Sequence, residues 1–99
     1  MSTPQMVLLV KFKSALSLEE INRVIDSRIE DFRQLQGLQQ KYYLLDSASG
    51  ELAGLYLWES KEDLQSYNES ELRKTIAKAY QAIGEPRVEV FSVLKPLRE

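Results

Sequence analysis

Apolar and polar positions follow two different periods along the chain, and these periods predict four strands and two helices. Alternation of apolar and polar residues, or short β-rich apolar runs, predicts strands at about residues 6–13, 39–47, 52–59 and 87–94. Apolar residues at helical spacing predict helices at about residues 18–36 and 61–83. A capping box of Ser17 with Glu20 begins the first helix, and Gly37 ends it.

The order of these elements is strand, helix, strand, strand, helix, strand. The link of residues 47–50 is short and ends in Gly50, which predicts a hairpin between the second and third strands. Residues 68–70 are weak for a helix, so we expect a break in the second helix there. The order predicts a single α+β domain over residues 1–99, a ferredoxin-like βαββαβ fold with a four-stranded antiparallel sheet and both helices on one face.

Alternation along the strands assigns their side chains to two faces of the sheet. The face expected to pack on the helices is mostly aliphatic: Leu8, Val10, Phe12, Tyr42, Leu44, Leu55, Leu57, Val88 and Val90. The opposite face mixes aromatic, aliphatic and charged side chains: Val7, Leu9, Lys11, Lys41, Tyr43, Leu45, Tyr56, Trp58, Glu89, Phe91 and Val93. A face this apolar needs a cover. The simplest cover is the same face of a second copy, so we expect a homodimer through the sheet face with room for a small ligand beside the sheet.

Three charged residues fall on this second face, where an unpaired charge is costly. Lys11 or Lys41 can pair with Glu89, which is a purely structural explanation. Alternatively, Lys41 faces a bound ligand at the tip of an otherwise apolar pocket.

Composition excludes several classes of function. The formal net charge of −2 shows no basic stripe for nucleic acid. No apolar run reaches the ~20 residues of a membrane span, and the first five residues lack the pattern of a signal peptide, so we expect a cytoplasmic protein. The sequence has no cysteine and no histidine, which removes the usual thiolate and imidazole groups. We therefore expect no metal and no cofactor.

The remaining chemistry lies in tyrosine, lysine, asparagine and tryptophan side chains. The candidates are Lys11, Lys41, Tyr43, Tyr56, Trp58, Tyr67, Asn68 and Tyr80. Tyrosine, lysine and asparagine can donate hydrogen bonds to a carbonyl or phenolate oxygen, and tryptophan offers a flat wall to an aromatic ring. Such a pocket can stabilise the anion of a phenolic or polycyclic molecule, and that anion can react with oxygen without help from a metal or flavin.

Four short segments together resemble a known family. They are Gly37–Tyr43 (GLQQKYY), Ala53–Trp58 (AGLYLW), Leu64–Tyr67 (LQSY) and Val88–Val93 (VEVFSV). In this combination the chain resembles the YdhR-like mono-oxygenase family from about Met6 to the C-terminus. The resemblance implies a dimeric α+β barrel, which agrees with the predicted order of elements.

The resemblance also implies roles for individual residues. Lys41, Tyr56 and Tyr67 match the lysine and tyrosines of the family pattern, and are expected to be catalytic. Tyr43 stands where the pattern has tryptophan and Trp58 where it has phenylalanine. These two residues, with Phe91 and Lys11, are expected to bind the substrate: Tyr43, Trp58, Phe91 and Lys11.

Three hypotheses follow for function. The first is a cofactor-independent mono-oxygenase acting on a phenolic or polycyclic aromatic small molecule. The second is a non-catalytic dimer, either a protein that binds a small aromatic ligand without turning it over or a stress-related protein. The third is a dimer interface with no cavity.

Overall fold

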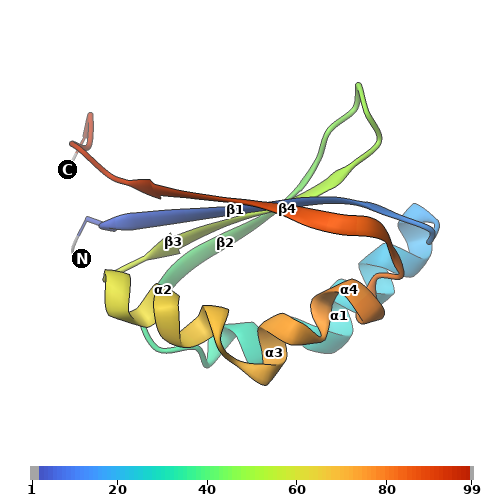
Figure 1. The fold of residues 1–99 in the computed structure, drawn as a ribbon, viewed down its shortest axis with the longest axis horizontal. Helices are drawn as coiled ribbons and strands as arrows, with labels where there is room; N and C mark the ends of the chain where they lie inside the picture. Colours follow the sequence, from blue (N-terminus) through green and yellow to red (C-terminus); the bar gives the residue numbers. More distant parts are fainter. Residues whose placement is uncertain (1–2, 99) are drawn as a thin grey trace.

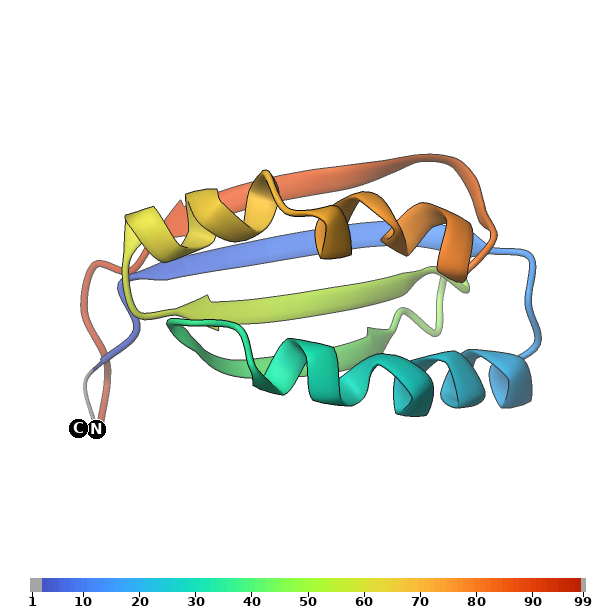
Figure 2. The same cartoon turned by 90° about the horizontal axis from the view of Figure 1, so that it is seen from below.

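A computed structural model describes residues 3–98 of the protein. The chain forms a four-stranded sheet with its helices layered on one side (Figures 1 and 2). In chain order the elements are β1 (Met6–Ser14), α1 (Leu18–Arg33), β2 (Leu38–Leu45), β3 (Leu52–Trp58), α2 (Lys61–Asn68), α3 (Glu71–Lys74), α4 (Ile76–Ala79) and β4 (Ala82–Ser92).

The sheet has the order β2-β3-β1-β4, and every neighbouring pair is antiparallel. The two long strands β1 and β4 lie side by side, and α1 and the α2–α4 segment cover the same face (Figure 2). This arrangement confirms the predicted ferredoxin-like α+β fold. Helix α1 begins with both halves of the predicted capping box, because Ser17 and Glu20 each bond the other's backbone N–H.

The second helical region is divided into three short helices. Helix α2 ends at Asn68, and the Ser70 hydroxyl accepts a hydrogen bond from the Arg73 N–H to begin α3. Strand β4 begins at Ala82, five residues before the expected start at residue 87. Gly84 and Pro86 would normally stop a strand, but β4 is an edge strand that shifts its register against β1 between Lys11 and Lys13, and edges and bulges tolerate both residues.

The face assignment of β2 and β3 from the sequence was wrong, whereas that of β1 was right. Tyr56 pairs with Leu8 across the sheet, and Trp58 pairs with Met6, so these aromatics share the helix-covered face. Both are almost fully buried. Both faces of β2 and β3 carry large apolar residues, so alternation alone could not choose between them. The larger aromatic side chains take the side that the helices cover, because burying them removes more apolar area from water.

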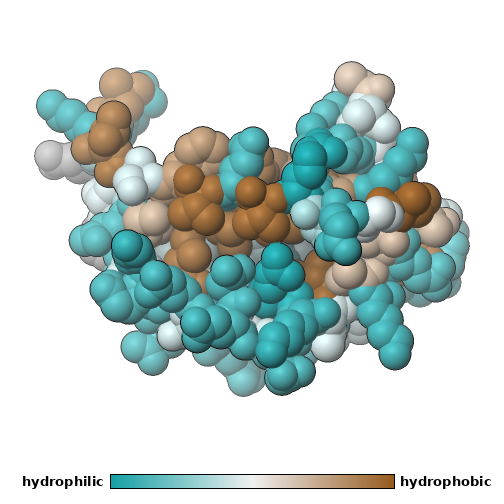
Figure 3. All heavy atoms as spheres, in the orientation of Figure 1, coloured by the Kyte–Doolittle hydropathy of each residue, from teal (hydrophilic) through white to brown (hydrophobic). Residues whose placement is uncertain are grey.

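The opposite side of the sheet is free of helices and is called the open face here. Cross-strand pairing places these mostly apolar side chains on it: Val7, Leu9, Tyr42, Leu44, Ala53, Leu55, Leu57 and Phe91. Tyr42, Leu44 and Phe91 are exposed. In Figure 3 hydrophobic side chains gather along the sheet, whereas the outer surface of the helices is hydrophilic.

No helix among residues 3–98 is long and apolar enough to cross a bilayer.

A pair of glycines provides a test of the loop that brings β2 under the helices. Gly37 and Gly50 both have a positive φ, near 79° and 77°. A Cβ at Gly37 would lie 2.0 Å from the Asp63 side chain, whereas nothing lies within 4 Å of one at Gly50. We expect Gly50→Ala to cost about 1 kcal/mol of unfolding free energy through backbone strain. Gly37→Ala should cost about 1–3 kcal/mol more, because α2 must move.

Urea denaturation of the two variants and the wild type measures this difference. Equal losses of unfolding free energy in Gly37→Ala and Gly50→Ala would show that α2 does not limit the space at Gly37.

Candidate functional site

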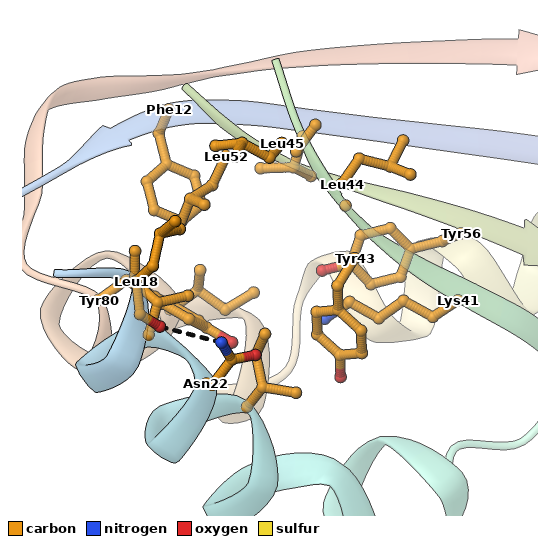
Figure 4. A pocket seen from close by; sticks show the side chains of 16 residues that line it. Phe12, Leu18, Asn22, Lys41, Tyr43, Leu44, Leu45, Leu52, Tyr56 and Tyr80 are labelled. Carbon is orange, nitrogen blue, oxygen red and sulfur yellow. Dashed lines mark hydrogen bonds between the residues drawn. The ribbon is translucent and has the colours of Figure 1, made fainter. Parts of the chain in front are cut away.

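A cavity of about 170 Å³ lies between the sheet and the helices α1 and α4. Its walls are mostly apolar and aromatic, and Lys41 is the one charged side chain among its lining residues. Lys41, Tyr43 and Tyr56 lie on one side of the cavity, while Phe12, Leu18 and Tyr80 lie on the other (Figure 4). Leu18 and Leu45 are half exposed, so the cavity opens between the start of α1 and the end of β2.

The side chain of Lys41 crosses the floor of this cavity in a box of aromatic rings. Its Nζ lies 3.5 Å from the ring centre of Phe32, 4.4 Å from that of Tyr43 and 4.5 Å from that of Tyr56. Gly54 makes room for the box, since a Cβ there would lie 2.9 Å from Tyr56 Cε1 and 3.5 Å from Lys41 Cε. The glycine on β3 thus allows lysine and tyrosine to lie side by side.

Within residues 3–98 Lys41 has no counter-ion, because no carboxylate there lies within 4.0 Å of its Nζ. Burial, with the positive charge of Arg28 as a second cause, lowers the pKa of Lys41 to about 7. Cation–π attraction to the three rings favours the ammonium form and offsets part of this effect. Near neutral pH the amine is therefore available in both its charged and its uncharged form.

Arg28 is a functional candidate that the sequence analysis missed. Its guanidinium donates hydrogen bonds to Leu72 O at 3.2 Å and Thr75 Oγ1 at 3.0 Å, which ties α1 to the junction of α3 and α4. Its Cζ lies 5.9 Å from the ring centre of Phe32, the ring that Lys41 also contacts. Position 28 falls on the same helical spacing as the apolar residues of α1. An arginine at an otherwise apolar position of this helix is the sequence signal that could have identified Arg28 as a candidate.

Tyr56 and Tyr67 form a buried hydroxyl pair. The Tyr67 hydroxyl donates to the Tyr56 hydroxyl at 3.1 Å. Burial raises the pKa of Tyr67 to about 12 and the pKa of Tyr56 well above its ordinary value. Burial likewise raises the pKa of Tyr80 to about 12. These phenols therefore stay protonated at neutral pH and act as hydrogen-bond donors, which leaves Lys41 as the group in the cavity that can exchange a proton near pH 7.

Three of the expected site residues come together at the cavity, namely Lys41, Tyr43 and Tyr56. Tyr67 does not line the cavity; it lies behind Tyr56, and its hydroxyl bonds the Tyr56 hydroxyl. Trp58 is fully buried and stacks on Tyr56 with ring centres 6.3 Å apart, so it supports the wall from behind.

The other two expected substrate-binding residues, Lys11 and Phe91, lie on the open face, across the sheet from the cavity. Lys11 Nζ lies 2.5 Å from Asp46 Oδ2, and this hydrogen bond lowers the pKa of Asp46 to about 2. The alternative pairs of Lys11 or Lys41 with Glu89 are not formed. The structure also adds cavity residues without a sequence signal of their own, of which Asn22 on α1 is the polar one.

No group of three histidine, cysteine, aspartate or glutamate side chains within residues 3–98 could hold a metal ion.

Comparisons with known proteins place the chain in a family. The family model described as "Putative mono-oxygenase ydhR" matches residues 7–99. No curated protein matches the sequence.

Solved structures share the fold at low sequence identity. SnoaB, a cofactor-independent oxygenase from Streptomyces nogalater, is 13% identical with a TM-score of 0.75, and the match covers 97% of this chain and 99% of that chain. A protein from Caulobacter crescentus described as a "putative antibiotic biosynthesis monooxygenase" is 15% identical with a TM-score of 0.74, and the match covers 94% of this chain and 92% of that chain. Rv0793 from Mycobacterium tuberculosis is 14% identical with a TM-score of 0.71, covering 93% and 97%.

The unpaired charge of Lys41 leads to a test of stability against pH. The folded pKa is about 7 and the ordinary value is 10.5, so below pH 7 both states carry the proton and the folded state bears the full cost of a buried charge. Between pH 7 and 10.5 the folded state releases the proton and this cost falls. We expect Lys41→Met to be more stable than the wild type by roughly 1–3 kcal/mol at pH 6. This advantage should shrink by pH 9.

Urea denaturation at pH 6, 7.5 and 9 measures the effect, with Lys13→Met as the control because Lys13 is exposed. A pH-independent difference, or a Lys41→Met protein that is less stable at pH 6, would contradict a buried unpaired amine.

Proposed function

The chain belongs to the ydhR mono-oxygenase family, and from this premise we propose that it is a cofactor-independent mono-oxygenase for a phenolic or polycyclic aromatic molecule. The observation that carries the proposal is the lysine amine in an aromatic cavity, with no carboxylate beside it and a pKa near 7. A phenol must lose a proton before it gives electrons to oxygen, and this amine is placed to take it.

The cavity accepts an aromatic ring at its inner end. An apolar cavity of roughly 150 Å³ is large enough for benzene. The cavity here measures about 170 Å³, so it accommodates one ring, while further rings of the substrate extend past Leu18 and Leu45 at the mouth. The rings of Tyr43 and Tyr56 provide flat contact surfaces for the buried part.

Two donors then stabilise the substrate anion. After Lys41 takes the proton, its ammonium attracts the phenolate or carbanion across a poorly hydrated space. The Tyr56 hydroxyl accepts from Tyr67, which leaves the Tyr56 proton to donate to the substrate oxygen. Lys41 and Tyr56 thereby act as the catalytic residues, and Tyr67 acts through Tyr56 as a positioning residue.

The electrons for oxygen come from the substrate. The substrate anion passes an electron to O₂, and the carbon that lost its negative charge forms a C–O bond, giving a peroxide anion that takes the proton of the Lys41 ammonium and becomes a hydroperoxide. The Lys41 amine then removes the hydrogen that remains on this carbon as a proton, the electrons of that C–H bond form the new carbonyl, and the O–O bond breaks. The outer oxygen leaves as hydroxide, which takes the proton back from Lys41 and becomes water. Conversion of a phenol C–H or an anthrone CH₂ to C=O with one O₂ and release of one water balances without an external reductant.

Oxygen uptake with 1-naphthol and with anthrone tests the proposal, together with detection of the quinone product. We expect Lys41→Met to lower kcat/KM by about 100-fold or more, which is the usual contribution of a general base. The wild-type kcat/KM should rise as pH increases through about 7, because only the uncharged amine accepts a proton. Tyr56→Phe should lower it by about tenfold, through loss of one donor.

Tyr42→Phe is the matched control, because Tyr42 lies on the open face and the change removes the same hydroxyl. Wild-type uptake no faster than that of Lys41→Met would overturn the proposal. Tight binding of the same compounds with full recovery would instead favour the second hypothesis, a ligand-binding protein that does not turn the ligand over.

The open face supports a second part of the proposal, a homodimer formed through it. The face is broadly apolar and lacks any helix cover in this chain. Large contiguous apolar patches of this kind usually mark an interface. A two-fold axis brings the same face of a second copy against it, so that the two sheets enclose the apolar side chains.

Solution mass measurement at micromolar concentration tests the dimer. We expect the wild type at twice the chain mass and Leu55→Lys, with a charge in the middle of the open face, at the mass of one chain. The control is Gln65→Lys, which adds the same charge on the exposed outer side of α2. A wild type that remains a monomer would exclude this interface.

A further inference from the structure

The surroundings of Lys41 permit a second reaction besides the proton transfer proposed above. The amine reaches the cavity from β2 and ends among three ring faces, with no carboxylate within 4.0 Å among the described residues. A lysine placed near another cation and away from water can act as a nucleophile as well as a base.

We propose that Lys41 captures a small aromatic aldehyde in the cavity as a reversible imine. This activity goes beyond the proposed oxygenase function, since it needs no oxygen and no oxidation of the ligand. It rests on the position of the amine, on the size of the cavity and on the donor beside it.

Two independent features keep the amine uncharged for a large part of the time at neutral pH. The first is removal from water by the rings and by the aliphatic walls of the cavity. The second is Arg28, which α3 and α4 hold in place through Leu72 O and Thr75 Oγ1. Desolvation and a neighbouring cation are the two usual ways to make a lysine nucleophilic, and both act on Lys41. The tyrosines around it, Tyr43 and Tyr56, stay neutral because burial raises the pKa of each.

The cavity sets the class of carbonyl compound. Its volume of about 170 Å³ suits one aromatic ring with a short substituent. The aromatic and aliphatic walls favour an uncharged ligand, and the two cations, Lys41 and Arg28, do not attract a further cation. An aldehyde carbon is also less crowded than a ketone carbon in so small a space. A one-ring aromatic aldehyde meets these conditions.

The covalent step balances without any further reactant. The lone pair of Lys41 Nζ forms a bond to the aldehyde carbon, while the carbonyl π bond opens and its oxygen takes one of the two amine protons, giving a carbinolamine. The nitrogen then loses its one remaining proton, which leaves with the hydroxyl as water, and a C=N bond forms. The Tyr56 hydroxyl, whose own oxygen accepts from Tyr67, is the donor that can hold the carbonyl oxygen during addition. Addition of water reverses the sequence and frees the aldehyde.

Reductive trapping tests the proposal on the full chain. The protein is incubated at pH 7 under nitrogen with benzaldehyde and sodium cyanoborohydride, and the benzylated positions are identified by peptide mass spectrometry. We expect Lys41 to be labelled at least about tenfold faster than any other lysine, because an ordinary lysine is almost fully protonated at this pH. The α-amino group, whose ordinary pKa is about 7.7–8.0, serves as the internal positive control.

Two variants complete the experiment. In Lys41→Arg we expect labelling at position 41 to vanish and labelling of the α-amino group to remain, while circular dichroism reports whether the chain is folded. Lys13→Arg changes an exposed lysine and should leave labelling of Lys41 unchanged. A second measurement on the wild type alone follows the labelling rate against pH. The labelling rate of Lys41 should exceed that of the exposed lysines at pH 7. Most of this difference should disappear at pH 10, where a large fraction of any ordinary lysine is uncharged.

Labelling of Lys41 at the same rate as Lys13 at pH 7 would overturn the proposal, and so would no labelling at all. Oxygen uptake with 1-naphthol is measured on the same preparation. Uptake without trapping overturns the imine and leaves the oxygenase proposal standing. Trapping without uptake overturns the oxygenase proposal and leaves the imine.

Discussion

The packing of Trp58 and Tyr56 against Tyr67 and Phe32 is the interaction on which the sheet, the helices and the cavity all depend. Tyr56 and Trp58 lie on one face of β3, and their rings are stacked in parallel. Tyr67 reaches them from α2 with ring centres 5.3 Å from each, and Phe32 reaches Tyr56 from α1 at 6.3 Å. One cluster therefore joins the central sheet to both helical segments. Each aromatic side chain buries a large area, so this cluster provides much of the driving force that a small core can supply.

The same cluster determines the chemistry of Lys41. A lysine next to these rings can reach solvent only in part, and it lies there because Gly54 on the neighbouring strand leaves space for its chain. A Cβ at position 54 would press on Tyr56 and touch Lys41. The protein thus places a costly group, an amine with no carboxylate partner among the described residues, in the wall of a cavity. Structures retain such arrangements mainly at functional sites.

The fold could be predicted from the sequence because its signals are local and repeated. Helix α1 carries a capping box and an apolar stripe, and both point to the same element. The prediction that Gly37 ends this helix was wrong, because α1 stops at Arg33 with Gln34 as its C-cap and Gly37 lies in the following loop with a positive φ. The orientation of β2 and β3 could not be predicted, because residues 42–45 and 54–58 offer large apolar side chains to both faces. The larger aromatic side chains lie on the face that the helices cover, and the pairing of β3 with β1 determines which residues these are. Lys41, Tyr43 and Tyr56 could be named as candidates from their side-chain chemistry and the family resemblance. The face of the sheet on which they lie could not be predicted, and neither could their separation from Lys11 and Phe91.

The break in the second helical region connects this packing to the reactivity of the site. Because α3 ends before Thr75, the carbonyl of Leu72 accepts hydrogen bonds from the Thr75 hydroxyl and from Arg28, and the same hydroxyl also accepts one from Arg28. A continuous helix would use that carbonyl within its own backbone ladder. The guanidinium is therefore held over Phe32, where its charge acts on Lys41 from the helix side. The end of α3 at Thr75 thus adds, through Arg28 on α1, to the lowering of the Lys41 pKa that burial mainly causes.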